Sequence, residues 1–225
     1  MRLNFRSTSV LSAMCFLMTT SACVSPGVRQ SAIRWNLRSK QNRETAYHSS
    51  AQRLASRSQE ELGRLMESQP APEPSELVGT WYGVNKGYGA AMAGLHQDVK
   101  VFHACGTSVS GHNILVKQVA IEDLACKGWQ PKLDRATGLP KQMGNFVVET
   151  CNNECGKRKL QLNYSKAENP TLDPTRFLVD ELVIIEPGLI LGRARVKIGE
   201  MDLPVAYFVL TRDASKDSAC DSYCD

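Results

Sequence analysis

Two histidines and a pair of adjacent carboxylates are the side chains of this chain best suited to acid–base chemistry. His103 and His112 lie near the middle of the sequence, and Asp180 and Glu181 lie within an apolar segment. Imidazole and carboxylate groups are the usual general acids and bases of enzymes. Successive residues of a strand point to opposite faces, so Asp180 and Glu181 cannot act on one substrate together. One hypothesis is therefore a hydrolase or isomerase that uses His103 or His112 with Asp180.

Each of these residues also has a structural interpretation. His103 shares a strand face with Val99 and Val101, where a histidine is more often a satisfied core residue than a ligand or base. Asp180 alternates with apolar neighbours such as Leu182. We expect Asp180 to be a solvent-facing charge, and the alternative is an inward group held by Arg or Tyr.

Two glycine-rich segments lack the spacing of known catalytic loops. Residues 106–111 carry Ser110 where a nucleophile elbow needs glycine. Residues 87–94 do not match the dinucleotide-binding fingerprint and lack its strand–helix–strand context. We therefore expect no catalytic residue and no cofactor.

The N-terminus is typical of an exported chain. Residues 1–22 contain two arginines, a short apolar stretch and a run of small residues, which indicates a signal peptide too short to span a bilayer. The run Thr20-Ser21-Ala22-Cys23 resembles the lipobox of bacterial lipoproteins. This resemblance implies that Cys23 is acylated, and Val24 after it implies an outer-membrane anchor with the chain facing the periplasm. The alternative is an ordinary signal peptide with an incidental Cys23.

Six further cysteines form the second feature of an exported chain. An even number is typical of disulfides in an oxidising compartment. We expect three local pairs, and pairing of the C-terminal cysteines with distant ones is the alternative. Two Cys-x3-Cys spacings also suggest zinc, but export disfavours free thiolates, so we expect no metal. The expected pairs are Cys105 with Cys126, Cys151 with Cys155, and Cys220 with Cys224.

The net charge of +4 comes from the part of the chain that precedes the folded domain. Residues 76–225 carry 17 basic and 18 acidic side chains, which leaves no positive excess to release counterions from phosphates. We therefore expect no nucleic-acid binding. Residues 23–75 are predicted to form a basic tether with a helix near 45–67, ended by the proline-rich 69–74. The folded domain is then 76–225.

Period-two alternation through the domain predicts about eight short antiparallel strands, which form a barrel or a sandwich. The pattern is clearest in 189–198, where apolar or small residues alternate with arginine and lysine. In 98–105 the same rule places Val99 and Val101 inward and Asp98 and Lys100 outward.

Two short segments favour the barrel. The run Gly79-Thr80-Trp81 resembles the Gly-x-Trp opening of lipocalin-type barrels, and Arg212 follows the last expected strand, where that family has a basic residue. The resemblance implies that Arg212 stacks on Trp81 and that the pair closes one end of the barrel without catalysing a reaction. The expected fold is mainly β: an antiparallel lipocalin-like barrel of about eight strands, preceded by a signal peptide and a basic, partly helical tail.

These observations lead to a non-catalytic function as the first hypothesis. A lipid-anchored barrel that binds an apolar or amphipathic small molecule is expected, because small inward residues leave room for a cavity. The alternative is a barrel filled by its own side chains, which serves as a structural or interaction module and contacts an envelope protein. The candidate cavity residues are Tyr164, Ile190, Gly192, Ala194, Val196, Tyr207 and Phe208.

Overall fold

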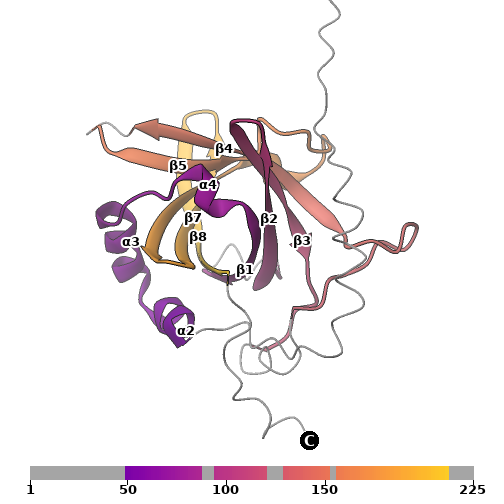
Figure 1. Ribbon diagram of the computed structural model, residues 1–225, viewed down its shortest axis with the longest axis horizontal. Coiled ribbons are helices and arrows are strands. Elements are labelled where there is room, and N and C mark those ends of the chain that lie inside the picture. The colour runs from indigo at the N-terminus through magenta and orange to yellow at the C-terminus, as the bar shows by residue number, and fades with distance from the viewer. Residues whose placement is uncertain (1–48, 88–93, 121–128, 153–155, 213–225) are drawn as a thin grey trace, which may run out of the picture.

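Eight antiparallel strands form a closed barrel in the computed structural model (Figure 1). The structure describes residues 49–87, 94–120, 129–152 and 156–212. Each strand pairs with the next along the chain, and β8 pairs with β1 to close the sheet. This confirms the predicted fold class. The strands are β1 (Gly79–Lys86), β2 (Gln97–Cys105), β3 (Ser108–Leu115), β4 (Gln142–Asn152), β5 (Arg158–Asn163), β6 (Leu178–Glu186), β7 (Leu189–Ile198) and β8 (Met201–Thr211).

Both faces of the sheet are apolar over much of the barrel. The inner face carries a core that includes Trp81, Phe102 and Phe208, and the outer face carries a second core that includes Val99 and Leu191. Successive residues of a strand point to opposite faces of the sheet. A strand that is covered on both faces therefore has apolar residues at both odd and even positions. The chain can therefore bury two apolar layers with one sheet.

The predicted orientation of β2 is wrong. Val99 and Val101 belong to the outer core, whereas Lys100 contacts the interior residue Tyr164. The outer face is apolar here because the segment after β3 packs over it with Trp129, whose ring lies 5.5 Å from that of Tyr82. Asp98 and Lys100 thus occupy inner positions of this strand, together with the apolar Phe102.

Two helices on the outer surface replace the single helix expected near 45–67. They are α2 (Ser49–Ser56) and α3 (Gln59–Ser68), and the short α4 (Pro74–Leu77) leads into β1. Ser58 interrupts the helix because it caps α3: its hydroxyl accepts from the backbone N–H of Glu61, and the Glu61 carboxylate accepts from the Ser58 N–H. Part of the expected tether is thus folded.

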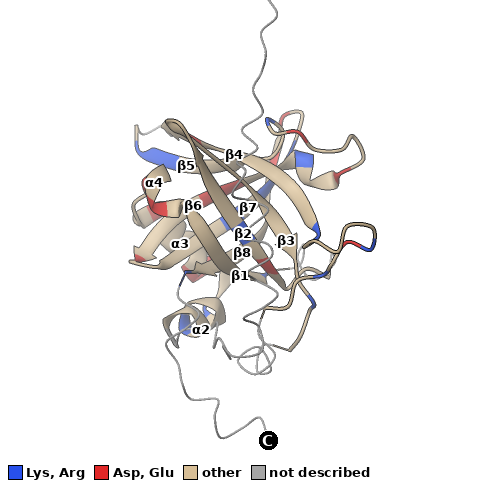
Figure 2. Ribbon diagram, turned by 45° about the vertical axis from the view of Figure 1, so that its right-hand side comes forward, with Lys and Arg blue, Asp and Glu red and all other residues tan. Residues whose placement is uncertain are grey.

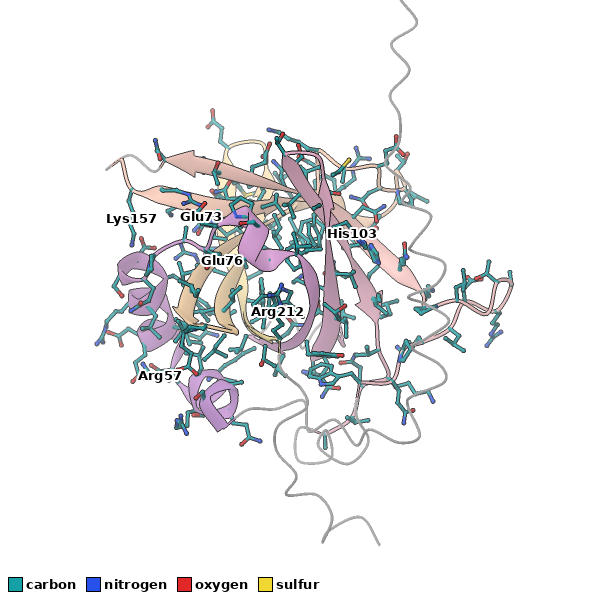
Figure 3. All side chains as sticks on the ribbon, in the orientation of Figure 1. Arg57, Glu73, Glu76, His103, Lys157 and Arg212 are labelled. Atoms are coloured by element: carbon teal, nitrogen blue, oxygen red, sulfur yellow. The ribbon has the colours of Figure 1, made fainter. Side chains whose placement is uncertain are left out.

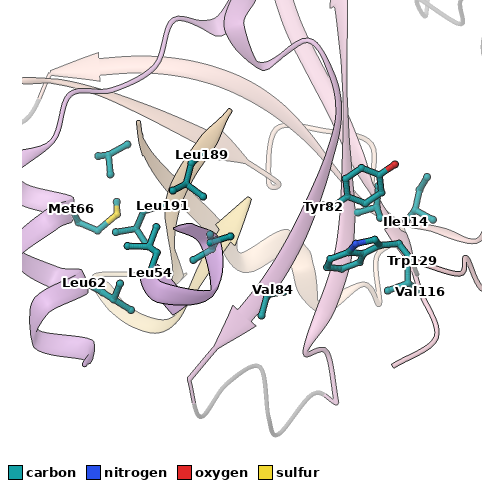
Figure 4. Packing of buried hydrophobic residues seen from close by; sticks show 14 residues of the cluster. Leu54, Leu62, Met66, Tyr82, Val84, Ile114, Val116, Trp129, Leu189 and Leu191 are labelled. Atoms are coloured by element: carbon teal, nitrogen blue, oxygen red, sulfur yellow. The ribbon is translucent and has the colours of Figure 1, made fainter. Parts of the chain in front are cut away.

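The apolar sides of these helices cover the outer face of the barrel. Leu54, Leu62 and Met66 are buried in the outer core, where they lie near Leu189 and Leu191 (Figure 4). Burial of such side chains stabilises by about 1.5–3 kcal/mol each. The predicted boundary at residue 76 therefore does not separate the helices from the barrel. Across the ranges that the structure describes, no helix is long and apolar enough to cross a membrane.

Replacing Ser58 by alanine should destabilise the protein by about 1 kcal/mol, because the first turn of α3 loses its hydrogen-bonded cap. Urea unfolding measures the change. Ser68→Ala is the matched control at the other end of the helix, where no N-terminal cap is lost and a change within about 0.5 kcal/mol is expected. Equal losses in the two variants would contradict the capping role.

Candidate functional site

A buried lysine lies at the centre of a polar cluster inside the barrel. Lys100 of β2 stands directly opposite Asn113 of β3 in the strand register, and its Nζ donates to Asn113 Oδ1 at 2.8 Å and to the Tyr164 hydroxyl at 3.0 Å. Nζ also lies 3.3 Å from Asp180 Oδ2 and 3.4 Å from Asp98 Oδ2. One cation thus links residues from four separate segments of the chain.

Aromatic rings enclose this cation. Nζ lies 4.9 Å from the centre of the Phe208 ring, 5.8 Å from that of Tyr164 and 5.9 Å from that of Phe146. Ring faces attract cations, most strongly when water is excluded. Lys100 is 4% exposed and Asp180 is 2% exposed, so the cluster lies in a low-dielectric environment where unpaired charge is costly.

The cluster shifts the proton affinity of its members. Burial alone lowers the pKa of Lys100, but the neighbouring Tyr164, Asp98 and Asp180 outweigh it and raise that pKa above its usual range. Burial also raises the pKa of Asp180, against the opposing effects of Lys100 and Tyr164. Lys100 therefore holds its proton firmly, and Asp180 takes up a proton more readily than an exposed aspartate.

Asp180 is an inward group, so the expectation of a solvent-facing charge is wrong. Tyr164 donates from its hydroxyl to Asp180 Oδ2 at 2.8 Å. The other oxygen, Oδ1, is buried and has no hydrogen-bond partner within the described part of the chain. Lys100, Asp98 and Asn113 were not identified as site residues from the sequence. The available signal for Asp98 and Lys100 was that they alternate in step with the aromatic Phe102 on the same strand.

Glu181 points outward, as its position next to Asp180 requires. Arg193 of β7 donates to Glu181 Oε2 from Nε at 3.0 Å, and Lys159 of β5 donates to Oε1 at 3.2 Å. Arg193 also reaches Glu67 of α3 at 3.0 Å. Figure 2 marks positions of charged residues by colour on the ribbon of β5, β6 and β7. These ion pairs connect α3 to the outer face of the sheet, so they have a structural role.

The small inward residues of β7 are covered by a neighbouring ring. Ile190, Gly192 and Ala194 face the interior as predicted, together with Tyr164 and Phe208. The Phe208 ring occupies the space beside Gly192, because a Cβ built there would lie 2.1 Å from two ring carbons. The two remaining candidates differ: Tyr207 packs against the outer core, and Val196 is half-buried.

Arg212 lies over the ring of Trp81, next to the pairing of β8 with β1. The guanidinium carbon of Arg212 lies 5.0 Å from the centre of the Trp81 ring, and Arg212 also donates to the carbonyl of Val78. The indole N–H donates to Leu77 O at 2.7 Å. Figure 3 shows Arg212 beside the start of β1. This is the stacking that the resemblance to lipocalin barrels implies.

The two histidines lie on the outer face, away from the interior cluster. The rings of His103 and His112 stack with their centres 5.3 Å apart. They lie on the same face as Val101, which pairs with His112 and packs against the outer core. Because Asp180 points inward, the structure does not bring it together with either histidine. The acid–base pairing considered from the sequence is therefore not formed.

Acidification should destabilise the protein through His112. Burial, together with the neighbouring His103, lowers the pKa of His112 from 6.5 to about 4. The unfolded chain therefore binds a proton that the folded chain excludes, and stability present above pH 6.5 is lost as the pH falls to about 4. The loss from this residue is about 3 kcal/mol.

Urea unfolding across this pH range measures the effect of His112. The His112→Gln variant should lose less stability on acidification than the unaltered protein. The matched control is the same substitution at His96, which lies exposed on the surface. Identical pH profiles for the unaltered protein and His112→Gln would contradict the assignment.

Only part of the cysteine prediction falls on described residues. Cys105 is disulfide-bonded. Cys151 is a free, exposed thiol at the end of β4, opposite Lys159, so the expected Cys151–Cys155 disulfide is not formed in the structure. Within the described ranges no group of three or more metal-binding side chains occurs. Outside those ranges lie the signal peptide and Cys23, Cys126, Cys155, Cys220 and Cys224.

Comparisons with known proteins leave the fold and the interior cluster as the basis for a functional proposal. The chain matches no family model. No curated protein sequence matches it either.

Proposed function

We propose that the protein is a non-catalytic, lipid-anchored module of the bacterial cell envelope whose barrel is filled by its own side chains. The observation that carries this proposal is the position of the Phe208 ring beside Gly192. A ligand held in a barrel of this type needs that interior space for itself. Eight strands give an interior just wide enough for side chains to fill or for one small ligand, so the position of Phe208 decides between the two.

Other side chains also occupy the interior. Trp81 belongs to the inner core, and Arg212 lies over its ring. Elsewhere a short 3-10 helix, η2 (Pro174–Phe177), brings the buried Thr175 to the interior. A Cβ on Gly144 would lie 3.1 Å from Thr175 and 2.9 Å from Asn113. These contacts support a barrel whose interior is filled by side chains and which interacts with other molecules through its outer surface.

The tip of the β7–β8 hairpin is the surface that we propose for a protein partner. Ile198 pairs with Met201, and Val196 pairs with Leu203, so the four side chains share one face of the hairpin. Ile198, Met201 and Leu203 are 49–56% exposed. Apolar side chains gathered on an exposed surface are typical of protein–protein contacts. The lipid anchor at Cys23 would hold this surface close to the outer membrane.

A ligand-binding barrel is the second candidate, and one observation favours it. Asp180 Oδ1 has no hydrogen-bond partner among the residues that the structure describes. A buried carboxylate oxygen is normally bonded, and the N–H or O–H of a small amphipathic molecule would satisfy it. A bound water would do the same.

Ligand extraction separates the two candidates. Protein purified from its native membranes in mild detergent is extracted with organic solvent, and the extract is analysed by mass spectrometry. We expect no lipid-like compound in stoichiometric amount. The Phe208→Ala variant, which removes the ring beside Gly192, is the control and should take up an apolar probe such as N-phenyl-1-naphthylamine. A stoichiometric compound from the unaltered protein would replace the first proposal by the second.

Two further measurements test the anchor and the partner surface. The intact mass of membrane-derived protein should correspond to an acylated chain that begins at Cys23, and Cys23→Ser should lack the acyl mass. Chemical crosslinking in native membranes should yield an adduct that a Met201→Asp, Leu203→Asp variant loses. An unacylated chain, or an adduct unchanged by these substitutions, would overturn the corresponding part of the proposal.

A further inference from the structure

The interior cluster holds the components of an amide-forming reaction between two of its own side chains. An amine, a carboxamide and two carboxyl groups lie within a few ångströms of each other, in surroundings closed by Phe146, Phe208 and Tyr164. Holding reacting groups together in one geometry greatly raises the rate of such condensations. This chemistry is separate from the proposed envelope function.

We propose that Lys100 and Asn113 condense to an isopeptide bond that joins β2 to β3 inside the barrel. The two residues face each other directly in the register, and Nζ is 2.8 Å from Oδ1 of the Asn113 amide. Because Oδ1 is bonded to Cγ, the amine already lies beside the carbon that it would attack. Both side chains are buried, at 4% and 6% exposure, so water does not compete.

The carboxyl groups supply the proton transfers that the reaction needs. Lys100 holds its proton firmly and is nucleophilic only as the neutral amine, so the reaction is slow and depends on Asp98 Oδ2, 3.4 Å from Nζ, to accept the proton that the ammonium must lose. The leaving nitrogen of Asn113 must gain a proton. The Tyr164 hydroxyl lies 3.4 Å from Nδ2 and donates to Asp180 Oδ2. Protonated Asp180 is the acid, and its proton reaches the leaving nitrogen through the Tyr164 hydroxyl.

The atoms balance without an oxidant, a reductant or a second substrate. The bond from Nζ to Cγ forms, the bond from Cγ to Nδ2 breaks, and the amide nitrogen leaves as ammonia. After attack, the amine nitrogen must lose a second proton, which Asp180, 3.3 Å away, accepts. This proton replaces the one that Asp180 gave to the leaving nitrogen through Tyr164. The product replaces a buried cation with a neutral amide, which removes a charge from a site where charge is costly to bury.

Tryptic peptide mapping of the purified, reduced and alkylated protein tests the bond. Cleavage after Lys86, Lys100 and Lys117 ordinarily separates residues 87–100 from 101–117. The isopeptide bond blocks cleavage at Lys100, so we expect one peptide of residues 87–117 that is about 17 Da lighter than its sequence through the loss of ammonia. Fragmentation should show no break between the two linked residues.

Lys100→Arg is the matched control because it keeps the cation in the cluster but removes the nucleophilic amine. This variant should be cleaved at residue 100 and should show no mass loss. Asp180→Asn should retain the neighbouring groups while slowing or abolishing the reaction. A mass loss with normal cleavage at Lys100 would indicate a succinimide at Asn113 and would overturn the proposal. So would folded, unaltered protein that is cleaved at Lys100 with its full mass after prolonged incubation at 37 °C.

Discussion

Relative to protein in which Lys100 still carries its charge and is not linked to Asn113, the Lys100→Met variant should have a free energy of unfolding about 3–5 kcal/mol lower at neutral pH, because removing one partner leaves buried charge uncompensated. Asp98 and Asp180 both depend on Nζ, at 3.4 and 3.3 Å, for their compensating charge. Methionine retains most of the length of the side chain, so little of the loss arises from a cavity. Urea unfolding followed by tryptophan fluorescence measures the change.

Three comparisons isolate the charge. Lys197→Met removes a lysine from an exposed ion pair with Asp202 and should cost less than about 1 kcal/mol. The double variant Lys100→Met, Asp180→Leu should recover part of the lost stability, since it also removes one of the buried carboxyl groups that have lost their compensating cation. The deficit of Lys100→Met should shrink in acid, where the remaining carboxyls take up protons. A loss no larger than that of Lys197→Met would contradict a charge-dependent core.

The barrel could be predicted because its first and last strands carry local signals. The resemblance of Gly79 to Trp81, with Arg212 at the far end, to lipocalin-type barrels implied where the sheet begins and closes. The alternation in 189–198 predicted the correct inner face for Ile190 and Gly192. These signals depend on residues within one or two strands. They are therefore readable from a single sequence.

The polar interior could not be predicted in the same way. Alternation assigns a charged residue to the solvent side only when one face of the sheet meets water, and β2 is covered on both faces. Lys100 is compensated by partners from other strands, such as Tyr164 and Asp180, and these contacts exist only after the barrel closes. The break between the two helices was different, because the spacing of Ser58 and Glu61 is a capping-box pattern visible in the sequence.

Phe208→Ala should also destabilise the protein by about 3–5 kcal/mol, because it removes a fully buried ring and leaves a cavity. Phe208→Leu retains much of the volume and should cost less. Gly192→Ala should be destabilising as well, because the added methyl group would overlap the Phe208 ring at 2.1 Å. The backbone of Gly192 lies outside the left-handed region, so the cost of this substitution comes from the overlap.

The two substitutions should offset each other when they are combined. In Phe208→Ala the ring is gone, so the methyl group of Gly192→Ala fills part of the cavity instead of meeting an obstacle. A double-mutant cycle should therefore show a favourable coupling of about 1–3 kcal/mol. Additive losses in urea unfolding would mean that Phe208 does not occupy the space beside Gly192, and the argument for a filled barrel would lose its main support. A favourable coupling would place the ring in the folded protein where a ligand would otherwise lie.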